Sequence, residues 1–532
     1  MRGNARRTSR FAAYAASAGL AISGTILAVT PVEAATPDPW PASQAAAWLG
    51  GQLEDGLMHN PNFGGFDDYG LSIDAAFALA VAGGNASRVQ SISDAIEANI
   101  GSYIGTGSEL YSGSAAKSAV LAQVAAEDPT DFGGVDLIQK VESTVSSTSP
   151  IEGRLEDQSA FGDFANTLGQ SLAARALSTA GSGQAAAVTE YLLDQQCTSG
   201  YFRLNFSAKS ASDQSCAEGT DAPDTDATAY AVLQLASQGS DPDVAAAIAQ
   251  AKTWLAAQQR TDGSWGGGTS TEGSNANSTG LAAWALGDTG DSEQAAQWLR
   301  AHQATDYDVC DKLANQRGAI AYDDAGLAAG RSNGITPATQ DQWRRASAQA
   351  LPALAYVPQD TTPAAPVLTG PAGYLKTGTR PVLTTSGVGT GDQLCLTGVG
   401  AAVQGTASGS TWRSAVTLPA GTRTRVYTVR DAFGHTDTLA VKVLGRATLS
   451  VTKSKSRVKR SRYVTATVRY LAPGEWARVF YKGSLVRSGK ATSAGTFSAR
   501  FRVGRALGKK KIVGYGHFTD IRRGATVIKV VR

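Results

Sequence analysis

The feature that most restricts the fold is a sequence frame that occurs twice in the first half of the chain. The stretches WLAAQQRTDGSWGG (residues 254–267) and YLLDQQCTSGYF (residues 191–202) each place an aromatic residue, a leucine and a glutamine in a helical run, followed by a turn with glycine and a second aromatic residue. A frame that returns along a chain indicates a fold of repeated units. The shared positions are Trp254, Leu255, Gln259, Gly263 and Trp265 in one copy, and Tyr191, Leu192, Gln196, Gly200 and Phe202 in the other.

Two partial copies extend this pattern. WLRAHQ (residues 298–303) repeats the first half without the glycine, and WLGGQLEDG (residues 48–56) repeats the frame with one residue fewer. A helix pair cannot bury its apolar face alone, so neighbouring pairs must be held at a fixed rotation. The glutamine can hydrogen-bond backbone groups of the next turn, its amide can lie on the aromatic ring, and glycine allows the backbone angles of the turn. We therefore predict that the frame is a clasp between helical units.

A second recurring feature marks helix starts. Several stretches place Asp, Asn, Ser or Thr directly before a helix of small residues, where their side chains can accept hydrogen bonds from first-turn N–H groups. The spacing of the repeats is about 40–60 residues, which is typical of one helix pair per unit. The stretches are GGFDDYGLSIDAAFALA, FGDFANTLGQSLAARAL, PDTDATAYAVLQLA, SNANSTGLAAWAL and IAYDDAGLAAG.

The chain divides into regions of different character. At 532 residues it is too long for one ordinary core. We expect a helical domain over residues 35–358 and a Pro/Thr/Ala-rich linker over 359–366. Short alternating runs after the linker predict two β domains, residues 367–445 and 446–532, with immunoglobulin-like sandwiches as the expected architecture. The predicted fold class is multidomain, all-α followed by two all-β domains.

The N-terminus and the cysteines both indicate export. Residues 1–34 combine a basic start, a small apolar run and a VEA sequence typical of a signal-peptide cleavage site. Retention of the run as a membrane anchor remains the alternative. Cys197 and Cys216 flank a polar loop and are the predicted disulfide, whereas Cys310 and Cys395 can pair with each other or stay free. The location is therefore predicted to be secreted or cell-surface associated, in a bacterium.

The charge is strongly segregated. Residues 446–532 hold 22 basic residues against Glu475 and Asp520, a net charge of +20, while the rest of the chain carries −17. Because export argues against a nucleic-acid partner, we expect this domain to bind an anionic cell-envelope polymer or lipid surface. Docking on the acidic helical domain is the intramolecular alternative. The predicted surface-binding residues are Lys453, Lys455, Arg457, Lys459, Arg460, Arg462, Lys509, Lys510 and Lys511.

The clasp frame resembles the QW repeat of squalene and other triterpene cyclases. The resemblance covers about residues 40–355 and implies an α/α toroid, a fold shared with protein prenyltransferase β-subunits, complement-type thioester domains and cobalamin carriers. Because one fold carries many functions, each activity needs its own residues.

The resemblance to cyclases extends to one acidic motif. Those enzymes use an Asp-x-Asp-Asp motif whose protonated carboxyl group starts a cation cascade. This chain has PDTDATA, with Asp224 and Asp226 as candidate catalytic residues and Ala227 in place of the last aspartate. Helix capping is the structural interpretation of the same residues, and we prefer it.

Other toroid activities have less support in the residues. The zinc site of prenyltransferases would need Asp308, Cys310 and a later histidine, and the helical region has none after His302. A Cys-Gly-Glu-Gln thioester is absent. A cobalamin-type carrier with a C-terminal β domain stays open. Carbohydrate cleavage by an acid pair also stays open, near the aromatic residues Phe66, Tyr69 and Tyr322. The candidate acids are Asp67, Asp68, Glu156, Asp157, Asp163, Asp323 and Asp324.

These observations favour a non-catalytic exported binding protein. We expect its toroid to hold an unknown small-molecule or protein ligand, and its basic domain to retain it on an anionic envelope. We expect no cofactor, no metal and no nucleic-acid partner. The alternatives are a terpenoid-cyclase-like enzyme with Asp226 as general acid and a cobalamin-type carrier.

Overall fold

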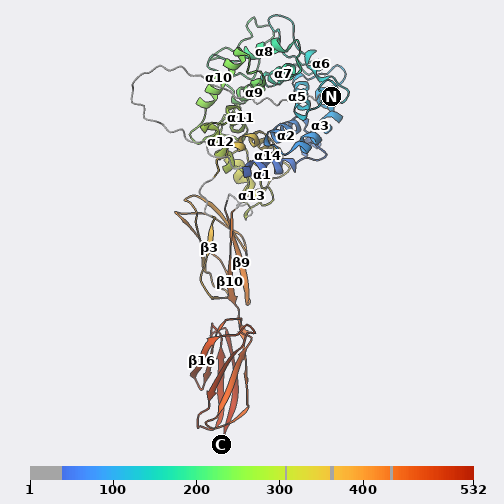
Figure 1. Cartoon of the computed structure of the whole chain (residues 1–532). Coiled ribbons are helices and arrows are strands. Elements are labelled where there is room, and N and C mark those ends of the chain that lie inside the picture. Colours follow the sequence, from blue (N-terminus) through green and yellow to red (C-terminus); the bar gives the residue numbers. More distant parts are fainter. Residues whose placement is uncertain (1–38, 306–307, 309, 360–364, 399, 432–434) are drawn as a thin grey trace, which may run out of the picture. The chain divides into compact units, whose positions relative to one another are not determined.

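Helices occupy the first part of the chain and strands the last part, as the sequence predicts (Figure 1). The computed structural model describes residues 39–305, 308, 310–359, 365–398, 400–431 and 435–532. The predicted signal segment, residues 1–34, lies outside the described residues. None of the described helices combines the length and the apolar character needed to cross a membrane.

Six helices form a closed inner ring. Each packs against the next, and the last packs against the first, so the ring closes. The inner helices, in ring order, are α2 (Tyr69–Ala82), α5 (Ser112–Ala125), α7 (Thr167–Ala180), α9 (Thr225–Leu235), α11 (Ala276–Leu286) and α14 (Gln340–Ala350).

An outer layer of helices covers this ring, which makes the domain an α/α toroid. Five outer helices follow their inner partners in the chain, whereas α1 comes first in the sequence and packs beside α14 and the 3₁₀ helix Leu351–Tyr356. The N-terminal helix thus completes the last pair. The outer helices are α1 (Pro39–Gly50), α3 (Ala86–Ala98), α6 (Leu137–Glu142), α8 (Ala185–Leu193), α10 (Pro242–Ala257) and α12 (Gly290–Ala301).

Short elements connect the helix pairs. They are the hairpin β1 (His59–Asn60) and β2 (Phe66–Asp67), the helices α4 (Ile100–Ile104) and α13 (Asp324–Asn333), and the 3₁₀ turns Asn62–Gly64 and Ala236–Gln238.

Small residues let the inner helices approach closely. A methyl group on Gly280 of α11 would lie 2.5 Å from the Cα atom of Ala350 in α14, and one on Gly169 of α7 would lie 3.1 Å from the Cα atom of Gly113 in α5. The five predicted helix caps are all confirmed, since each side chain accepts a hydrogen bond from a first-turn N–H group. The capping residues are Asp68, Asn166, Asp224, Asn275 and Asp323.

The first β region contains two sheets that enclose one apolar cluster, which includes Leu394, Trp412 and Tyr427. The five-stranded sheet has the order β4 (Tyr374–Lys376), β10 (Thr436–Leu444), β9 (Arg423–Asp431), β6 (Gln393–Thr397) and β7 (Val403–Thr406). The three-stranded sheet has the order β3 (Val367–Thr369), β5 (Val382–Ser386) and β8 (Thr411–Ala415).

The second β region repeats this plan around a core that includes Val468, Val479 and Ile512. One sheet has the order β11 (Ala447–Thr448), β19 (Arg522–Val531), β18 (Gly508–Tyr515), β15 (Trp476–Tyr481) and β16 (Ser484–Lys490), and β13 (Arg457–Lys459) also pairs with β19. The other has the order β12 (Ser450–Lys453), β14 (Tyr463–Arg469) and β17 (Phe497–Arg502).

Candidate functional site

All six inner helices contribute to a cavity of about 470 Å³, which we call the central cavity. Its size falls in the range of small-molecule pockets. The sequence left open whether the centre of the toroid holds a cavity, and the inner helices line this one. The lining includes Asp74, Tyr103, Lys117, Asp157, Phe164, Leu172, Asp226, Tyr230, Asn277, Leu281 and Gln349.

Lining residues recur at fixed positions in the helical repeat. In α9 they are the second and sixth residues after the cap, Asp226 and Tyr230, and in α11 they are Asn277 and Leu281. The fourth residue of α9 after the cap has a different role, because the Thr228 hydroxyl accepts from the Phe202 N–H, at 2.9 Å. Successive turns of one helix face are spaced three or four residues apart, so this repeat places chemically different side chains around one centre.

A half-buried ion pair belongs to the lining of the central cavity. The Lys117 ammonium lies 2.6 Å from Asp74 Oδ1 and donates to the Gly70 carbonyl at 2.9 Å. Burial lowers the pKa of Lys117, but the charge and hydrogen bond of Asp74, together with Tyr103 and Tyr230, raise the pKa above its ordinary value. Burial raises the pKa of both Tyr103 and Tyr230 beside this pair. The pair is therefore charged but locally neutral, and it is flanked by neutral phenols.

A smaller cavity of about 100 Å³ adjoins the central cavity. It shares Asp74, Tyr230, Leu281 and Gln349 with the central cavity. Arg175 also lines it and donates to Gln234 Oε1 at 3.2 Å. The two cavities are thus neighbours that share part of their polar lining.

The two aspartates of PDTDATA have different environments. Asp224 caps α9, because its Oδ1 accepts from the Ala227 N–H at 2.9 Å. Asp226 lines the central cavity. Burial raises the pKa of Asp226 to about 6; the nearby Ser278 hydroxyl lowers it and the Asp224 carboxylate raises it further. Capping therefore explains Asp224, whereas Asp226 lies in the first turn of α9 and does not cap it.

Two buried oxygen atoms of this cavity, Asp226 Oδ1 on α9 and Asn277 Oδ1 on the neighbouring helix α11, lack hydrogen-bond partners among the described residues. The Ser278 hydroxyl lies beside the Asp226 carboxyl group and lowers its pKa through a hydrogen bond. A buried polar group without a partner costs about 1–3 kcal/mol, so native proteins rarely keep several together. The adjacent loop contains Gly267, where a methyl group would lie 2.9 Å from both Asp226 Oδ2 and Ser278 Oγ. The glycine keeps the space beside these oxygens open.

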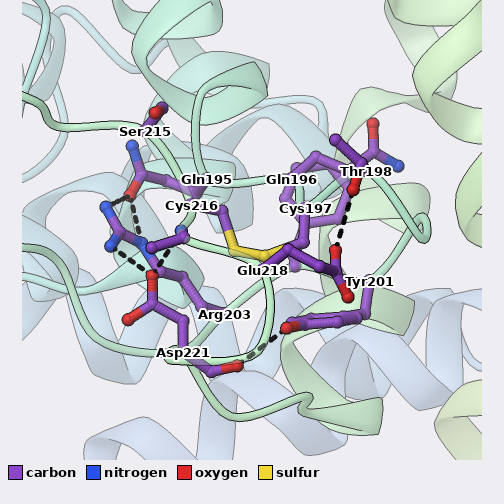
Figure 2. The surroundings of a disulfide bond; sticks show 12 residues. Gln195, Gln196, Cys197, Thr198, Tyr201, Arg203, Ser215, Cys216, Glu218 and Asp221 are labelled. Carbon is purple, nitrogen blue, oxygen red and sulfur yellow. Dashed lines mark hydrogen bonds and ion pairs between the residues drawn. A yellow bond between two sulfur atoms is a disulfide. The ribbon is translucent and has the colours of Figure 1, made fainter.

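A cross-linked loop leads into α9 (Figure 2). The predicted disulfide Cys197–Cys216 is confirmed. Arg203 is buried, pairs with Asp221 at 2.7 Å, and donates to Gln195 Oε1 from both Nε and Nη2. Because these contacts immediately precede Asp224 in the chain, they fix the loop from which Asp226 enters the cavity.

The glutamines of the frame bridge successive units. Gln259 Nε2 donates to the carbonyls of Gly263, at 3.0 Å, and Asp291 of α12, at 2.8 Å. Gln196 Nε2 donates likewise to the carbonyls of Gly200 and Ala247, the latter in α10, both at 2.9 Å. Each glutamine thus joins its own turn to the next outer helix.

The sequence predicts that an aromatic ring of the frame packs on the glutamine amide. The aromatic side chains instead make the following contacts. Trp265 is fully buried and its indole N–H donates to the Leu255 carbonyl at 2.8 Å. Tyr191 donates to Gln214 Oε1 at 3.0 Å, and Trp254 packs against Tyr201. These side chains fill the junction between units.

The partial copies behave in two ways. Gln303 Nε2 donates to the Pro41 carbonyl of α1 at 2.9 Å and to the Gly318 carbonyl at 3.3 Å. The missing glycine of WLRAHQ is therefore supplied fifteen residues later, and this clasp closes the ring. Gln52, in contrast, donates only a long hydrogen bond to Trp48 O within its own helix end, at 3.4 Å.

The other catalytic alternatives find less support in the geometry. Cys310 forms a disulfide with Cys395, so its thiolate is not available to a zinc ion. The carbohydrate-cleavage candidates are held by structural contacts: Asp163 pairs with Arg154 at 3.0 Å, and Asp157 Oδ1 accepts from the Ser112 N–H at 2.8 Å. Further contacts hold Asp67 (His59), Asp68 (Leu71 N–H, Arg345), Glu156 (Lys209), Asp323 (Gly326 N–H) and Asp324 (His302).

Most of the predicted surface-binding residues are exposed on the second β region. Two are half-buried, Lys510 and Lys453, and the ammonium of Lys453 donates to Thr526 Oγ1 at 3.3 Å. The exposed members are Lys455, Arg457, Lys459, Arg460, Arg462, Lys509 and Lys511.

Sequence reasoning missed Asn277, Ser278, Asp74 and Lys117. The repeat itself carried a usable signal for Asn277, because aligning PDTDATA with SNANSTG at their caps places Asn277 opposite Asp226. No such signal marks Lys117, whose helix begins after Tyr111 without a side-chain cap.

Comparisons with solved structures find matches at low identity. A protein from Actinoplanes is 17% identical, with 60% of this chain and 99% of that chain covered and a TM-score of 0.41. The type II terpene cyclase MstE from Scytonema is 11% identical, with 59% and 96% covered and a TM-score of 0.42. Fibronectin(III)-like modules of Clostridium thermocellum CbhA are 11% identical, with 31% and 92% covered and a TM-score of 0.19. No family model matches the sequence, and no curated protein matches it. These values carry no functional argument, so function is argued from the cavity.

Proposed function

We propose that the toroid is a binding domain for a small molecule that carries hydroxyl or ammonium donors. The observation that carries this proposal is the pair of buried, unpartnered oxygens Asp226 Oδ1 and Asn277 Oδ1, which line the same cavity. Oxygens of this kind accept hydrogen bonds, so a ligand that supplies donors removes their cost. The ion pair of Lys117 and Asp74, which lines the same cavity, offers such a ligand further polar contacts.

A cyclase-like activity is the second candidate. It is favoured by the raised pKa of Asp226, about 6, which lets this carboxyl group hold a proton more readily than an ordinary aspartate does. The incomplete acidic motif disfavours it, because Ala227 stands where the cyclase motif has its last aspartate. The binding proposal therefore ranks first.

Native mass spectrometry on the protein recovered from its own envelope fraction tests the binding proposal. We expect excess mass that leaves on denaturation. We expect Asn277→Ala to lose it and Asp243→Asn, an exposed change on α10, to keep it. A bare wild-type protein that no polyol or amine stabilises against heat would contradict the proposal.

A product assay distinguishes the cyclase-like activity from ligand binding. The protein is incubated with a linear isoprenoid and the extract is analysed for cyclic products. Products from the wild type but not from Asp226→Asn, at unchanged helical content, would favour the enzyme. Binding of a polar ligand without any product would favour the carrier.

We further propose that the chain is exported and that residues 446–532 retain it on an anionic envelope. Two disulfides support an oxidising compartment. The two-sheet plan of each β region supports immunoglobulin-like modules. Fractionation of the native host tests retention: the full chain should remain with the envelope and leave it at high salt, whereas a chain ending at residue 445 should be released.

A further inference from the structure

Three cations lie side by side on the outer face of the second β region. Arg457 of β13 is the register partner of Lys529 in β19, and Lys529 is the register partner of Lys509 in β18. All three are exposed, while their neighbours Val458 and Val530 point into the core. We call Arg457, Lys529 and Lys509 the cationic row.

The row has no acidic neighbours within its own domain. The domain's two acids are Glu475, which is buried against Arg522, and Asp520, which pairs with Lys376. Like charges directly opposite each other on neighbouring strands destabilise a sheet. The strands that carry adjacent members are about 5 Å apart, within the Debye length of about 8 Å at physiological ionic strength. The row therefore lowers the stability of the free domain.

The row continues along the strands. Lys459 follows Arg457 on β13 and Lys511 follows Lys509 on β18, both on the same exposed face. The backbone positions that carry these cations are thus spaced by about 5 Å across the strands and by about 7 Å along them. A linear polymer with one negative charge per repeat can meet such a grid at several points at once.

The distribution of charge over the domain favours a polymer over a bilayer. The opposite sheet also exposes cations, Arg500 and Arg502 on β17, and the Arg500 guanidinium lies 4.9 Å from the centre of the Tyr463 ring. A flat membrane touches one face of a sandwich, whereas a flexible polymer can follow both. We propose that the cationic row binds a linear phosphodiester polymer of the cell envelope. This inference rests on the proposed retention function and assigns it a face and a ligand.

Matched variants of the full chain test the assignment. One replaces the row, Arg457→Gln, Lys509→Gln and Lys529→Gln. The control removes the same charge at exposed positions away from the row, Arg469→Gln, Lys490→Gln and Arg505→Gln. The probes are soluble poly(glycerol phosphate) and, separately, vesicles of equal parts phosphatidylglycerol and phosphatidylcholine, both at physiological ionic strength.

We expect the row variant to weaken polymer binding by about tenfold or more and the control by about threefold or less. The row variant should also melt at a higher temperature than the wild type, because neutralisation relieves the repulsion. Equal losses in both variants would overturn the assignment to the row while leaving retention by net charge. Vesicle binding without polymer binding would overturn the ligand class. A wild type that binds neither probe would overturn the retention function as well.

Discussion

At the scale of single residues, Asp226 links the fold to its chemistry. Asp226 is the second residue of α9, and Asp224 serves as the cap of that helix. Burial raises its pKa from 3.8 to about 6, so the ionised form is disfavoured in the folded state. The protonated form contributes full stability below the unfolded pKa, and this contribution is lost as the pH rises through about 6.

The first prediction concerns the replacement Asp226→Asn. The variant should be more stable than the wild type at pH 7.5, by at most about 3 kcal/mol, because it removes the cost of the buried charge. The difference should vanish near pH 4, where the wild-type carboxyl group is protonated. Thermal unfolding followed by circular dichroism at both pH values measures it. Asp224→Asn, which keeps a capping side chain, is the control and should change little. A difference that is the same at both pH values would contradict the assignment.

The sequence identified one member of this group of oxygens and missed its neighbours. Asp226 stands out because it resembles a known acidic motif, whereas Asn277 and Ser278 look like ordinary helix-start residues. Their role depends on the packing of α9 against α11, and on a loop glycine, Gly267, that leaves room beside them. Local sequence patterns do not encode contacts between turns that belong to different repeats.

At the scale of elements, the clasp turns decide how helix pairs stack. Gly263 has a φ of +88°, and a methyl group there would lie 2.7 Å from the carbonyl oxygen of Gln294 in α12. Gly200 and Gly318 meet Gln250 of α10 and Gln44 of α1 in the same way. The glycine is required both for its backbone angle and for the close approach of the next outer helix.

The second prediction separates these two requirements. Gly263→Ala should cost about 3 kcal/mol or more, because it combines left-handed backbone strain with a clash against α12. Gly181→Ala is the control: its φ is +69° and its ψ is +29°, in the left-handed helical region, and nothing lies within 4 Å of the added methyl group, so it should cost only about 1 kcal/mol. Thermal unfolding monitored by far-ultraviolet circular dichroism compares them. Equal losses would show that strain alone matters and that the clasp contact does not.

The elements with a strong periodic pattern were predictable from the sequence, and the irregular ones were not. The alternating runs around Tyr427 and Ile512 predicted strands that are present as β9 and β18. The short strands β7 and β13 were missed because three or four residues carry too little alternation, and β16 because most of its side chains are exposed. The displaced glycine, Gly318, was missed because an insertion separates it from its glutamine.

At the scale of the whole molecule, covalent links and charge distinguish the parts of the chain. Cys197–Cys216 closes a loop within the toroid, whereas Cys310–Cys395 joins the helical region to the first β region across a separation of 85 residues. The sequence favours the first pair because its members flank one loop. It leaves the second pair open, because nothing local relates positions that far apart. The strongly basic last domain contains neither link.

The last prediction uses the long-range disulfide. A protease site inserted within residues 360–364 interrupts the chain between Cys310 and Cys395, so cleavage should leave two fragments that remain joined through sulfur. On a gel without reductant the cleaved protein should run as one species, and with reductant it should separate into a helical fragment and a β fragment. The double variant Cys310→Ser, Cys395→Ser should separate under both conditions, while Cys197→Ser, Cys216→Ser should behave like the wild type. Separation of the wild type without reductant would show that the link is not formed. Retention of the joined species would mean that the toroid and the first β region stay covalently linked even when the linker is cut. A ligand held in the central cavity would then remain attached to the basic domain that is proposed to anchor it.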